Sequence, residues 1–338
     1  MTAELAVVGF CACAAVIFAA GGRLGRYGER IADATGLGGT WIGLILLATV
    51  TSLPELIVGI SSSTVVGSAD LAVGDVLGSC AFNLFLLAAL DAFVPHRRPL
   101  FAIASGRNVL AGALQIILLA VAGLGLLYPV SSPALPWIGW SSLALLVGYL
   151  LAIRLVYRQA QRAREGQEPL PDLDVDGAGL ADLTLRQVAL RYAAVSLVIV
   201  SAAAVLPLFA QAIARGLGLE ESLVGTLFLA ATTSLPELAV SLAVIRRGAV
   251  DLAVGNLLGS NLFNMTILAI DDLVYLGGPL LGDASGIHLV TVVSTIAMTA
   301  IAIIGLTYRP TGKRLVLAWD AAAILAVYAV NLGLVATS

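Results

Sequence analysis

Two glutamates lie inside apolar stretches of this 338-residue chain, and each ends the same five letters, TSLPE. The first copy ends at Glu55 and the second at Glu237. A carboxylate is costly to bury in a segment long enough to cross a bilayer, and carboxylates found there commonly bind ions or substrates. Because the pattern occurs twice, it predicts an ion site where two repeated halves of a transporter meet.

Hydroxyl groups accompany each glutamate. Thr51 and Ser52 precede Glu55 by four and three residues, which places all three side chains on one helical face. Thr233 and Ser234 stand in the same positions before Glu237. These side chains offer oxygen atoms without His or Cys, a set that suits hard cations such as calcium and sodium rather than zinc or copper.

A proline precedes each glutamate directly. Pro54 cannot donate to the carbonyl of Val50, and Pro236 cannot donate to that of Thr232. In a membrane such a released carbonyl must be satisfied by protein or by a polar cavity, and a cation can take that role. The prolines therefore predict that both segments are broken helices with backbone oxygens near the carboxylates.

A second motif also occurs twice, as GDVLGSCAFN at 74–83 and GNLLGSNLFN at 255–264. Its two glycines, four residues apart, permit close approach of another helix. Ser79 and Asn83 are one helical turn apart, and Ser260 and Asn264 repeat them. We expect this packing to bring their hydroxyl and amide oxygens to the broken helices.

The composition excludes an ordinary soluble domain, because hydrophobic residues make up 59%, charged residues 12%, and the mean hydropathy is +1.00. Apolar runs near the length of a membrane span are expected to form an all-α membrane protein of ten transmembrane helices, in two inverted five-helix repeats with helices 2 and 7 broken. The ten runs are 3–20, 38–66, 70–92, 106–128, 136–156, 188–212, 222–246, 250–275, 287–307 and 315–335.

The basic residues predict the orientation. All but one of the 18 Lys and Arg residues, Arg215, fall on one side of the ten spans, and that side is expected to be cytoplasmic. Both termini are then outside, and five helices per half force the second half to enter inverted. We expect a multi-pass protein of the plasma (inner) membrane, with repeats at 1–156 and 188–338 and a cytoplasmic linker at 157–187.

Other classes of site find little support. The linker aspartates Asp172, Asp174 and Asp176 alternate as in a calcium loop but lack its closing glutamate, so a solvated linker is favoured. The three cysteines form neither a disulfide nor a zinc pattern. A net charge of −3 carries no nucleic-acid signature. The expected partners are membrane lipid and transported cations, with no cofactor, and the chain is expected to be a monomer.

The doubled TSLPE and GxxxGSxxxN motifs resemble the sodium/calcium exchanger branch of the cation/calcium exchanger superfamily, prokaryotic type. The resemblance implies a secondary antiporter, not an enzyme, which exchanges calcium for sodium by alternating access. It implies Glu55 and Glu237 as calcium ligands, with carbonyls near Thr51 and Thr233, and Asn83 and Asn264 as further site positions. The sodium sites that it implies draw on Ala48, Ser52, Glu55, Ser79, Ala230, Ser234, Glu237 and Ser260.

The chain departs from the family pattern at several positions. Val50 and Thr232 replace the glycine that usually precedes TSLPE, and Asn264 stands where some members carry aspartate. Asp75 replaces an asparagine that the second copy keeps as Asn256. Asp75 shares a helical face with Ser79 and Asn83, so it is either a structural substitute or a third titratable group of the site. Proton-coupled calcium exchange therefore remains the alternative.

A cation channel and a hydrolase are two further classes of protein to consider. A cation channel would also use oxygen ligands, but two glutamates at one depth favour occlusion over an open path. A hydrolase using Ser52 or Ser234 would need a histidine base, and His96 and His288 are both expected at helix ends. Asp91 and Asp272, also at helix ends, are interpreted as structural charges rather than a proton relay.

Overall fold

The computed structural model describes residues 3–36, 38–94, 98–132, 136–165, 183–216, 229–313 and 316–337. This part of the chain is helical, apart from connecting segments and one isolated bridge between Ser131 and Gly139. In chain order the elements are α1 (Ala3–Thr35), α2 (Gly38–Ile42), η1 (Gly43–Leu47), α3 (Ala48–Thr51), α4 (Leu53–Ser61), η2 (Ser62–Val66), α5 (Ala69–Leu90), η3 (Asp91–Phe93), α6 (Leu100–Ile103), α7 (Asn108–Leu127), α8 (Trp140–Glu165), α9 (Leu185–Gly216), α11 (Leu229–Thr233), α12 (Leu235–Arg246), α13 (Val250–Val274), α14 (Leu280–Asp283), α15 (His288–Tyr308) and α16 (Trp319–Ala336).

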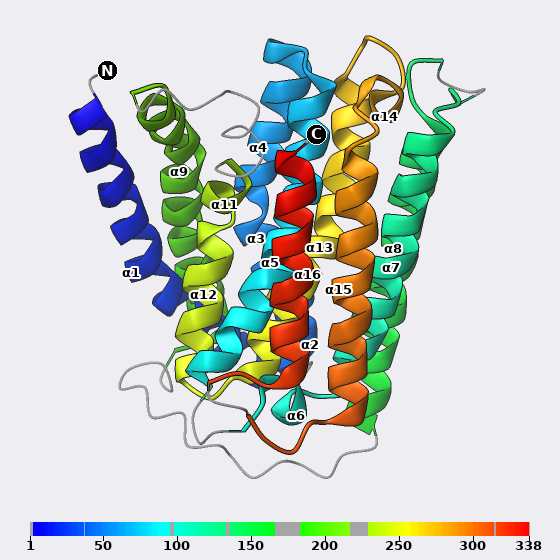
Figure 1. The fold of residues 1–338 in the computed structure, drawn as a ribbon. Coiled ribbons are helices and arrows are strands. Elements are labelled where there is room, and N and C mark those ends of the chain that lie inside the picture. Colours follow the sequence, from blue (N-terminus) through cyan, green and yellow to red (C-terminus); the bar gives the residue numbers. More distant parts are fainter. Residues whose placement is uncertain are drawn as a thin grey trace.

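The helices form an upright bundle with both chain termini toward one side (Figure 1). We call this the terminal side, and the opposite side, where α8 ends and α9 begins, the linker side. Eight of the described helices are long and apolar enough to cross a membrane, and the bent segment Gly39–Val66 makes a ninth if it counts as one span. The protein is therefore an all-helical, multi-pass membrane protein. The start of the expected span 222–246 lies outside the described residues, so ten spans remain a prediction.

Several helices extend beyond the apolar runs that predicted them. The first, expected to end near residue 20, continues as α1 to Thr35 and stops at Gly36, which adopts a left-handed conformation (φ 66°). The predicted linker 157–187 is helical at both edges, because α8 reaches Glu165 and α9 begins at Leu185. Thr184 and Gln187 cap the start of α9 reciprocally. The linker aspartates lie outside the described residues.

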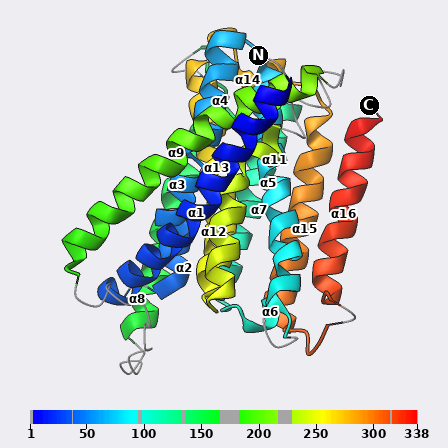
Figure 2. The same ribbon diagram turned by 90° about the vertical axis from the view of Figure 1, so that its left-hand side faces the viewer.

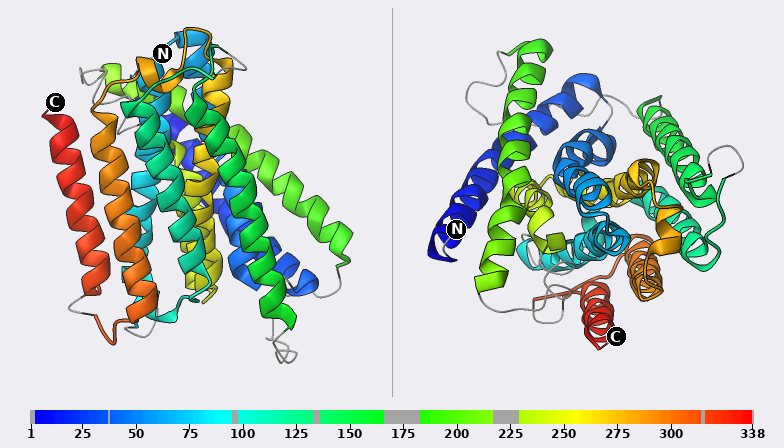
Figure 3. Two further views of the ribbon diagram at one scale, coloured as in Figure 1. Left: turned by 90° about the vertical axis from the view of Figure 1, so that its right-hand side faces the viewer. Right: turned by 90° about the horizontal axis from the view of Figure 1, so that it is seen from above.

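Two long helices occupy the centre of the bundle. In the most apolar window of α13, 89% of the residues are buried, and 67% are buried in that of α5, against at most 44% in the other spans. Viewed from the terminal side, the remaining helices surround these two (Figure 3). The apolar side chains exposed on the outer helices would face lipid. Because α5 and α13 carry the second motif, its polar residues are shielded from lipid.

The two proline-bearing segments break where the sequence predicted. Ser52 separates α3 from α4 with φ −91° and ψ 7°, and Ser234 separates α11 from α12 with φ −82° and ψ 9°. Pro54 and Pro236 each fall in the first turn after the break. The first pair of half-helices is bent by about 40°. Each break places a helix start directly before a glutamate.

Glycines of the second motif hold the first broken segment against α13. A methyl group on Gly255 would lie 2.6 Å from the carbonyl oxygen of Thr40, and one on Gly259 would collide with the backbone of Leu44. Any larger residue at either position would push α2 and η1 away. The matching segment for Gly74 and Gly78, at residues 217–228, lies outside the described residues.

The helices α1 and α9 lie side by side across the face of the bundle that contains the broken helices (Figure 2). Ile17 of α1 is fully buried with Ala203 and Leu206 of α9 and Ala239 of α12. Farther along α1, a methyl group on Gly21 would lie 3.1 Å from Cβ of Ala239. The pair thus packs directly on α12, the half-helix that contains Glu237.

Asp91 and Asp272 have the structural role expected of charged helix ends. Asp91 accepts hydrogen bonds from the backbone N–H of Leu100 (2.6 Å) and Ala318 (2.8 Å), and forms an ion pair with Lys313 (3.4 Å). Asp272 accepts from the N–H of Leu280 (2.6 Å) and Gly139 (2.8 Å). Each carboxylate ties the end of a central helix to two connecting segments.

Candidate ion-binding site

The two glutamates are each bound by the other copy of the motif. Ser52 donates a hydrogen bond to Oε1 of Glu237 (3.1 Å), and Ser234 donates one to Oε1 of Glu55 (3.2 Å). All four side chains are at most 1% exposed. Residues about 180 positions apart therefore form one polar cluster at the two helix breaks.

The threonines and serines of the two motifs continue this cluster. Thr51 lies 3.3 Å from Ser260, whose hydroxyl donates to Oε1 of Glu237 at 3.2 Å. Thr233 lies 3.5 Å from Ser79. The helices α5 and α13 thus each bring a serine to the broken helix of the other half of the chain.

Asp75 occupies the same place in one half as Asn256 in the other. Thr233 lies 3.5 Å from Oδ1 of Asp75, and Thr51 lies 3.3 Å from Oδ1 of Asn256. The amide of Asn256 also donates to Ser241 at 3.0 Å. Asp75 is fully buried and brings a third carboxylate into the cluster.

Several oxygen atoms in this region have no hydrogen-bond donor among the residues that the structure describes. One carboxylate oxygen of each glutamate is buried and unpaired, as are one oxygen of Asp75 and the amide oxygens of two asparagines. These atoms are Glu55 Oε2, Glu237 Oε2, Asp75 Oδ2, Asn83 Oδ1 and Asn264 Oδ1. Buried acceptors are normally paired, so a concentration of unpaired ones indicates a site that a cation can complete.

The amide groups of the two asparagines contact residues other than the glutamates. Asn83 donates to Oδ1 of Asn261 at 3.0 Å, and Asn264 contacts Sγ of Cys80 at 3.7 Å. Asn261 in turn donates to the carbonyl of Cys80 at 3.0 Å. The sequence did not predict Asn261 as a site residue. In the alignment of the two motif copies, Asn261 takes the position of Cys80.

The carbonyls of Ala48 and Ala230 are occupied in this conformation. Ala48 accepts from the N–H of Ser52 (3.0 Å) and the hydroxyl of Thr51 (3.3 Å). Ala230 accepts from the N–H of Ser234 (3.1 Å) and the hydroxyl of Thr233 (3.2 Å). A sodium ion that uses these carbonyls would therefore replace or share the threonine contacts.

The three carboxylates of the cluster are not close enough to one another to hold a metal by carboxylates alone. In the described ranges, no three side chains of His, Cys, Asp or Glu lie close enough together to hold an ion. A cation bound here would take its other ligands from hydroxyl, amide and carbonyl oxygens, which suits calcium or sodium.

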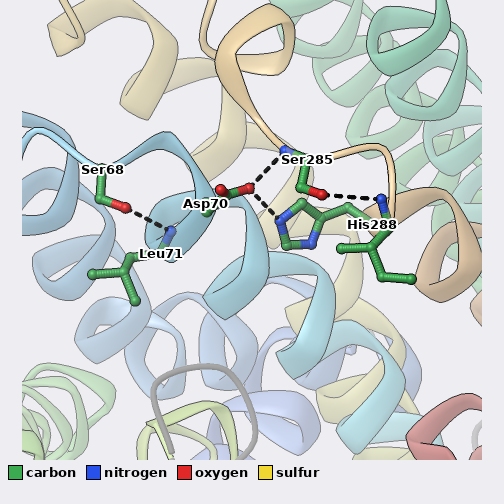
Figure 4. A network of polar contacts seen from close by, with 6 residues as sticks. Ser68, Asp70, Leu71, Ser285 and His288 are labelled. Carbon is green, nitrogen blue, oxygen red and sulfur yellow. Dashed lines mark hydrogen bonds and ion pairs between the residues drawn. The ribbon is translucent and has the colours of Figure 1, made fainter. Parts of the chain in front are cut away.

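The contacts of His288 do not support the hydrolase alternative. His288 pairs with Asp70 at 3.1 Å on the terminal side, next to the loop that contains Ser285 (Figure 4). Asp70 also accepts from the N–H of Ser285 at 2.6 Å. His96 lies outside the described residues. Ser52 and Ser234 instead donate to glutamates, so the described contacts provide no serine–histidine pair at the breaks.

Comparison with known proteins identifies the family. The family described as sodium/calcium exchanger protein matches residues 5–157 and 188–337, so the chain belongs to this family. The inner membrane protein YrbG of Escherichia coli is 36% identical to it over 67% of this chain and 66% of its own length. The chain thus spans just under two thirds of this relative. The sodium/calcium exchanger MaX1 of Methanosarcina acetivorans is 34% identical over 33% of this chain and 30% of its own length.

A solved structure has the same fold. The sodium-calcium exchanger NCX_Mj, soaked with 10 mM Na⁺ and zero Ca²⁺, matches with a TM-score of 0.72 over 98% of this chain and 99% of its own. Its sequence identity to this chain is 20%, so the match concerns the fold. Together with the family match, it confirms the resemblance inferred from the two motifs.

Proposed function

We propose that this protein is a secondary antiporter which exchanges calcium for sodium by alternating access, and that Glu55 and Glu237 hold the calcium ion. The observation that carries the proposal is the reciprocal pairing of Ser52 with Glu237 and of Ser234 with Glu55. It joins both halves in one site while leaving an oxygen of each glutamate free. Two carboxylates offset the charge of one divalent ion.

The inverted repeat is supported by matched contacts on opposite sides of the bundle. Asp70 accepts from the N–H of Ser285 at 2.6 Å on the terminal side, and Asp251 accepts from that of Ser105 at 2.6 Å on the linker side. The contact of His288 with Asp70 has its counterpart in that of Asn108 with Asp251, at 3.3 Å. Each contact joins one proposed repeat to the other.

This symmetry favours alternating access, because two inverted halves can exchange conformations and expose one central site to either side. On the proposed topology, 1–156 and 188–338 are the repeats, 157–187 is a cytoplasmic linker, and both termini are outside. The protein functions as a monomer in the plasma (inner) membrane.

Sodium ions would occupy the same oxygens once calcium has left. Their ligands would be the glutamates, the hydroxyls beside them and the two alanine carbonyls, with the asparagine oxygens completing the site. The proposed set is Ala48, Ser52, Glu55, Ser79, Asn83, Ala230, Ser234, Glu237, Ser260 and Asn264. Thr51 and Thr233 position the carbonyls through their contacts with Ala48 and Ala230.

Proton-coupled exchange is the second candidate, and the burial of Asp75 favours it. Asp75 adds a carboxylate that a single calcium ion does not neutralise once Glu55 and Glu237 are bound. If Asp75 instead has the same structural role as Asn256, sodium remains the proposed counter-ion.

Transport into liposomes separates these candidates. Purified protein is reconstituted, and uptake of radioactive calcium is measured against outward gradients of sodium, protons or potassium. We expect saturable uptake that requires the sodium gradient and is absent from the double variant E55Q/E237Q. Uptake driven by the proton gradient alone would identify protons, and not sodium, as the counter-ion. Non-saturating flux without any trans cation would indicate a channel and overturn the antiporter.

A further inference from the structure

One buried carboxylate in the terminal-side half of the bundle has no hydrogen-bond partner in the described part of the chain. Asp271 of α13 is 0% exposed, and neither carboxylate oxygen accepts a hydrogen bond from the described residues. Its neighbour Asp272 is bound by two backbone N–H groups. Because Asp271 and Asp272 are adjacent near a helix end, the sequence alone suggests two similar charges, and Asp271 was not predicted as a site residue.

The carboxyl of Asp271 lies against a helix that carries a site glutamate. A methyl group built on Gly59 of α4 would collide with both carboxylate oxygens of Asp271. Gly59 follows Glu55 by four residues, so it lies one turn farther along the same face of α4. Asp271 is thus positioned one helical turn from the site, toward the terminal side.

The linker-side half has no such group. Where the motifs are aligned, Leu90 takes the place of Asp271, and Ser241 takes that of Gly59. Ser241 is bound by the amide of Asn256 at 3.0 Å. The carboxyl of Asp271 and the glycine beside it, Gly59, therefore occur on the terminal side of the site and are replaced by Leu90 and Ser241 in the other half.

The surroundings of Asp271 provide no positive partner. The charge of Asp75 acts on Asp271 through space and is repulsive when both are ionised. The arginines of α8 and α12 lie toward the linker side, and no ion pair to Asp271 occurs among the described residues. The other titratable groups on helices in contact with α13 are Glu55 on α4, Asp70 and Cys80 on α5, Tyr149 and Tyr157 on α8, Glu237 on α12 and Asp283 on α14.

We propose that Asp271 is a proton-binding site on the terminal-side path to the cation site, which holds a proton while its carboxyl is enclosed against Gly59 and releases it when α4 and α13 separate. An isolated carboxylate in a dry environment is strongly disfavoured unless it is neutralised. A proton neutralises it without further ligands, whereas a metal ion requires several oxygens. No hydroxyl or amide group of the described residues donates a hydrogen bond to Asp271.

This inference rests on the proposed cation exchange and adds a proton to it. Glu55 and Gly59 belong to the same short helix, so a cation that draws Glu55 also moves the surface that encloses Asp271. Calcium binding from the terminal side should therefore be accompanied by release of the Asp271 proton.

Proton release on calcium binding tests the inference. Purified protein in detergent and weak buffer is titrated with calcium, and the released protons are counted with a pH-sensitive dye. We expect Asp271→Asn to bind calcium and to release about one proton fewer per calcium than the wild type. The matched control Asp283→Asn, which removes an exposed carboxylate on the same side, should release as many as the wild type.

Two outcomes would overturn the inference. The first is equal proton release from D271N and the wild type while both bind calcium, which would leave the proposed exchange itself standing. The second is misfolding of D271N, because an amide copies the size and neutrality of the protonated carboxyl and should be accepted beside Gly59. Absence of calcium binding from the wild type would instead count against the proposed function.

Discussion

The two copies of TSLPE are identical in sequence, yet their glutamates are bound differently. Glu237 accepts hydrogen bonds from two serines, Ser52 and Ser260. Glu55 accepts from one serine of the described residues, Ser234, and the buried Asp75 adds a further carboxylate to the same cluster. The second motif therefore determines how well the protein alone stabilises each carboxylate. In the proposed site, Glu55 would depend more on a bound ion than Glu237.

The largest expected effect comes from removing either glutamate's charge. We expect E55Q and E237Q each to abolish calcium exchange, with at least a hundredfold loss in calcium affinity. This corresponds to about 3 kcal/mol or more, the order expected when one member of a buried charge pair is removed. Calcium uptake by reconstituted protein and calcium titration of purified protein measure the two losses.

Glu29→Gln is a suitable control for this pair. Glu29 lies at the linker side, where it forms an ion pair with Arg247 at 2.9 Å. The variant should retain calcium exchange. Near-normal calcium flux in either E55Q or E237Q would exclude that glutamate from the site.

The serines should have unequal effects. Ser234→Ala removes the one described side-chain donor to Glu55, whereas Ser52→Ala leaves Glu237 with Ser260. A hydrogen bond to a charged group contributes about 1.5–3 kcal/mol. We expect S234A to weaken calcium binding by roughly tenfold or more and S52A by less. Calcium titrations of both variants measure this, and an equal loss would show that the two carboxylates are equally supported.

Asp75→Asn should have a smaller effect, because it makes one half resemble the other. The amide can take the structural role that Asn256 has beside Thr51. We expect calcium affinity to stay within about threefold of the wild type, below the contribution of one charged hydrogen bond. A loss of calcium affinity as large as that of E55Q would indicate that Asp75 is a calcium ligand. The two halves would then differ in the number of charged ligands as well as in the hydrogen bonds to their glutamates.

The smallest expected effects concern the matched contacts between the repeats. Asp251→Asn should lower the midpoint of thermal unfolding more than Asp70→Asn does, since the side chain of Asp70 is 56% exposed and that of Asp251 is half-buried. In D251N a neutral amide oxygen replaces the charged acceptor of Ser105 and Asn108, and the weakening of these hydrogen bonds corresponds to about 1–2 kcal/mol. The opposite order in detergent melting curves would show that the contact at His288 (Figure 4) is the more important one.

The positions of the two glutamates at helix breaks could be predicted from the sequence because the motif is repeated. The TSLPE copies placed Glu55 and Glu237 correctly at helix breaks, since proline and a buried carboxylate restrict the backbone strongly. The sequence did not predict that each serine binds the glutamate of the other half, because that pairing depends on how the broken helices approach each other. It did not distinguish Asp271 from Asp272 either. The packing of α4 against α13 encloses the carboxyl of Asp271, whereas two backbone N–H groups bind that of Asp272.

The most direct test of the account is whether sodium and calcium compete for one set of oxygens. Calcium binding to the purified wild type is titrated by calorimetry in sodium chloride and in the chloride of a large inert organic cation at equal ionic strength. The account predicts that the apparent Kd for calcium rises steadily with sodium and stays constant with the inert cation. An apparent Kd that is the same in both salts would contradict the shared site formed by Glu55 and Glu237.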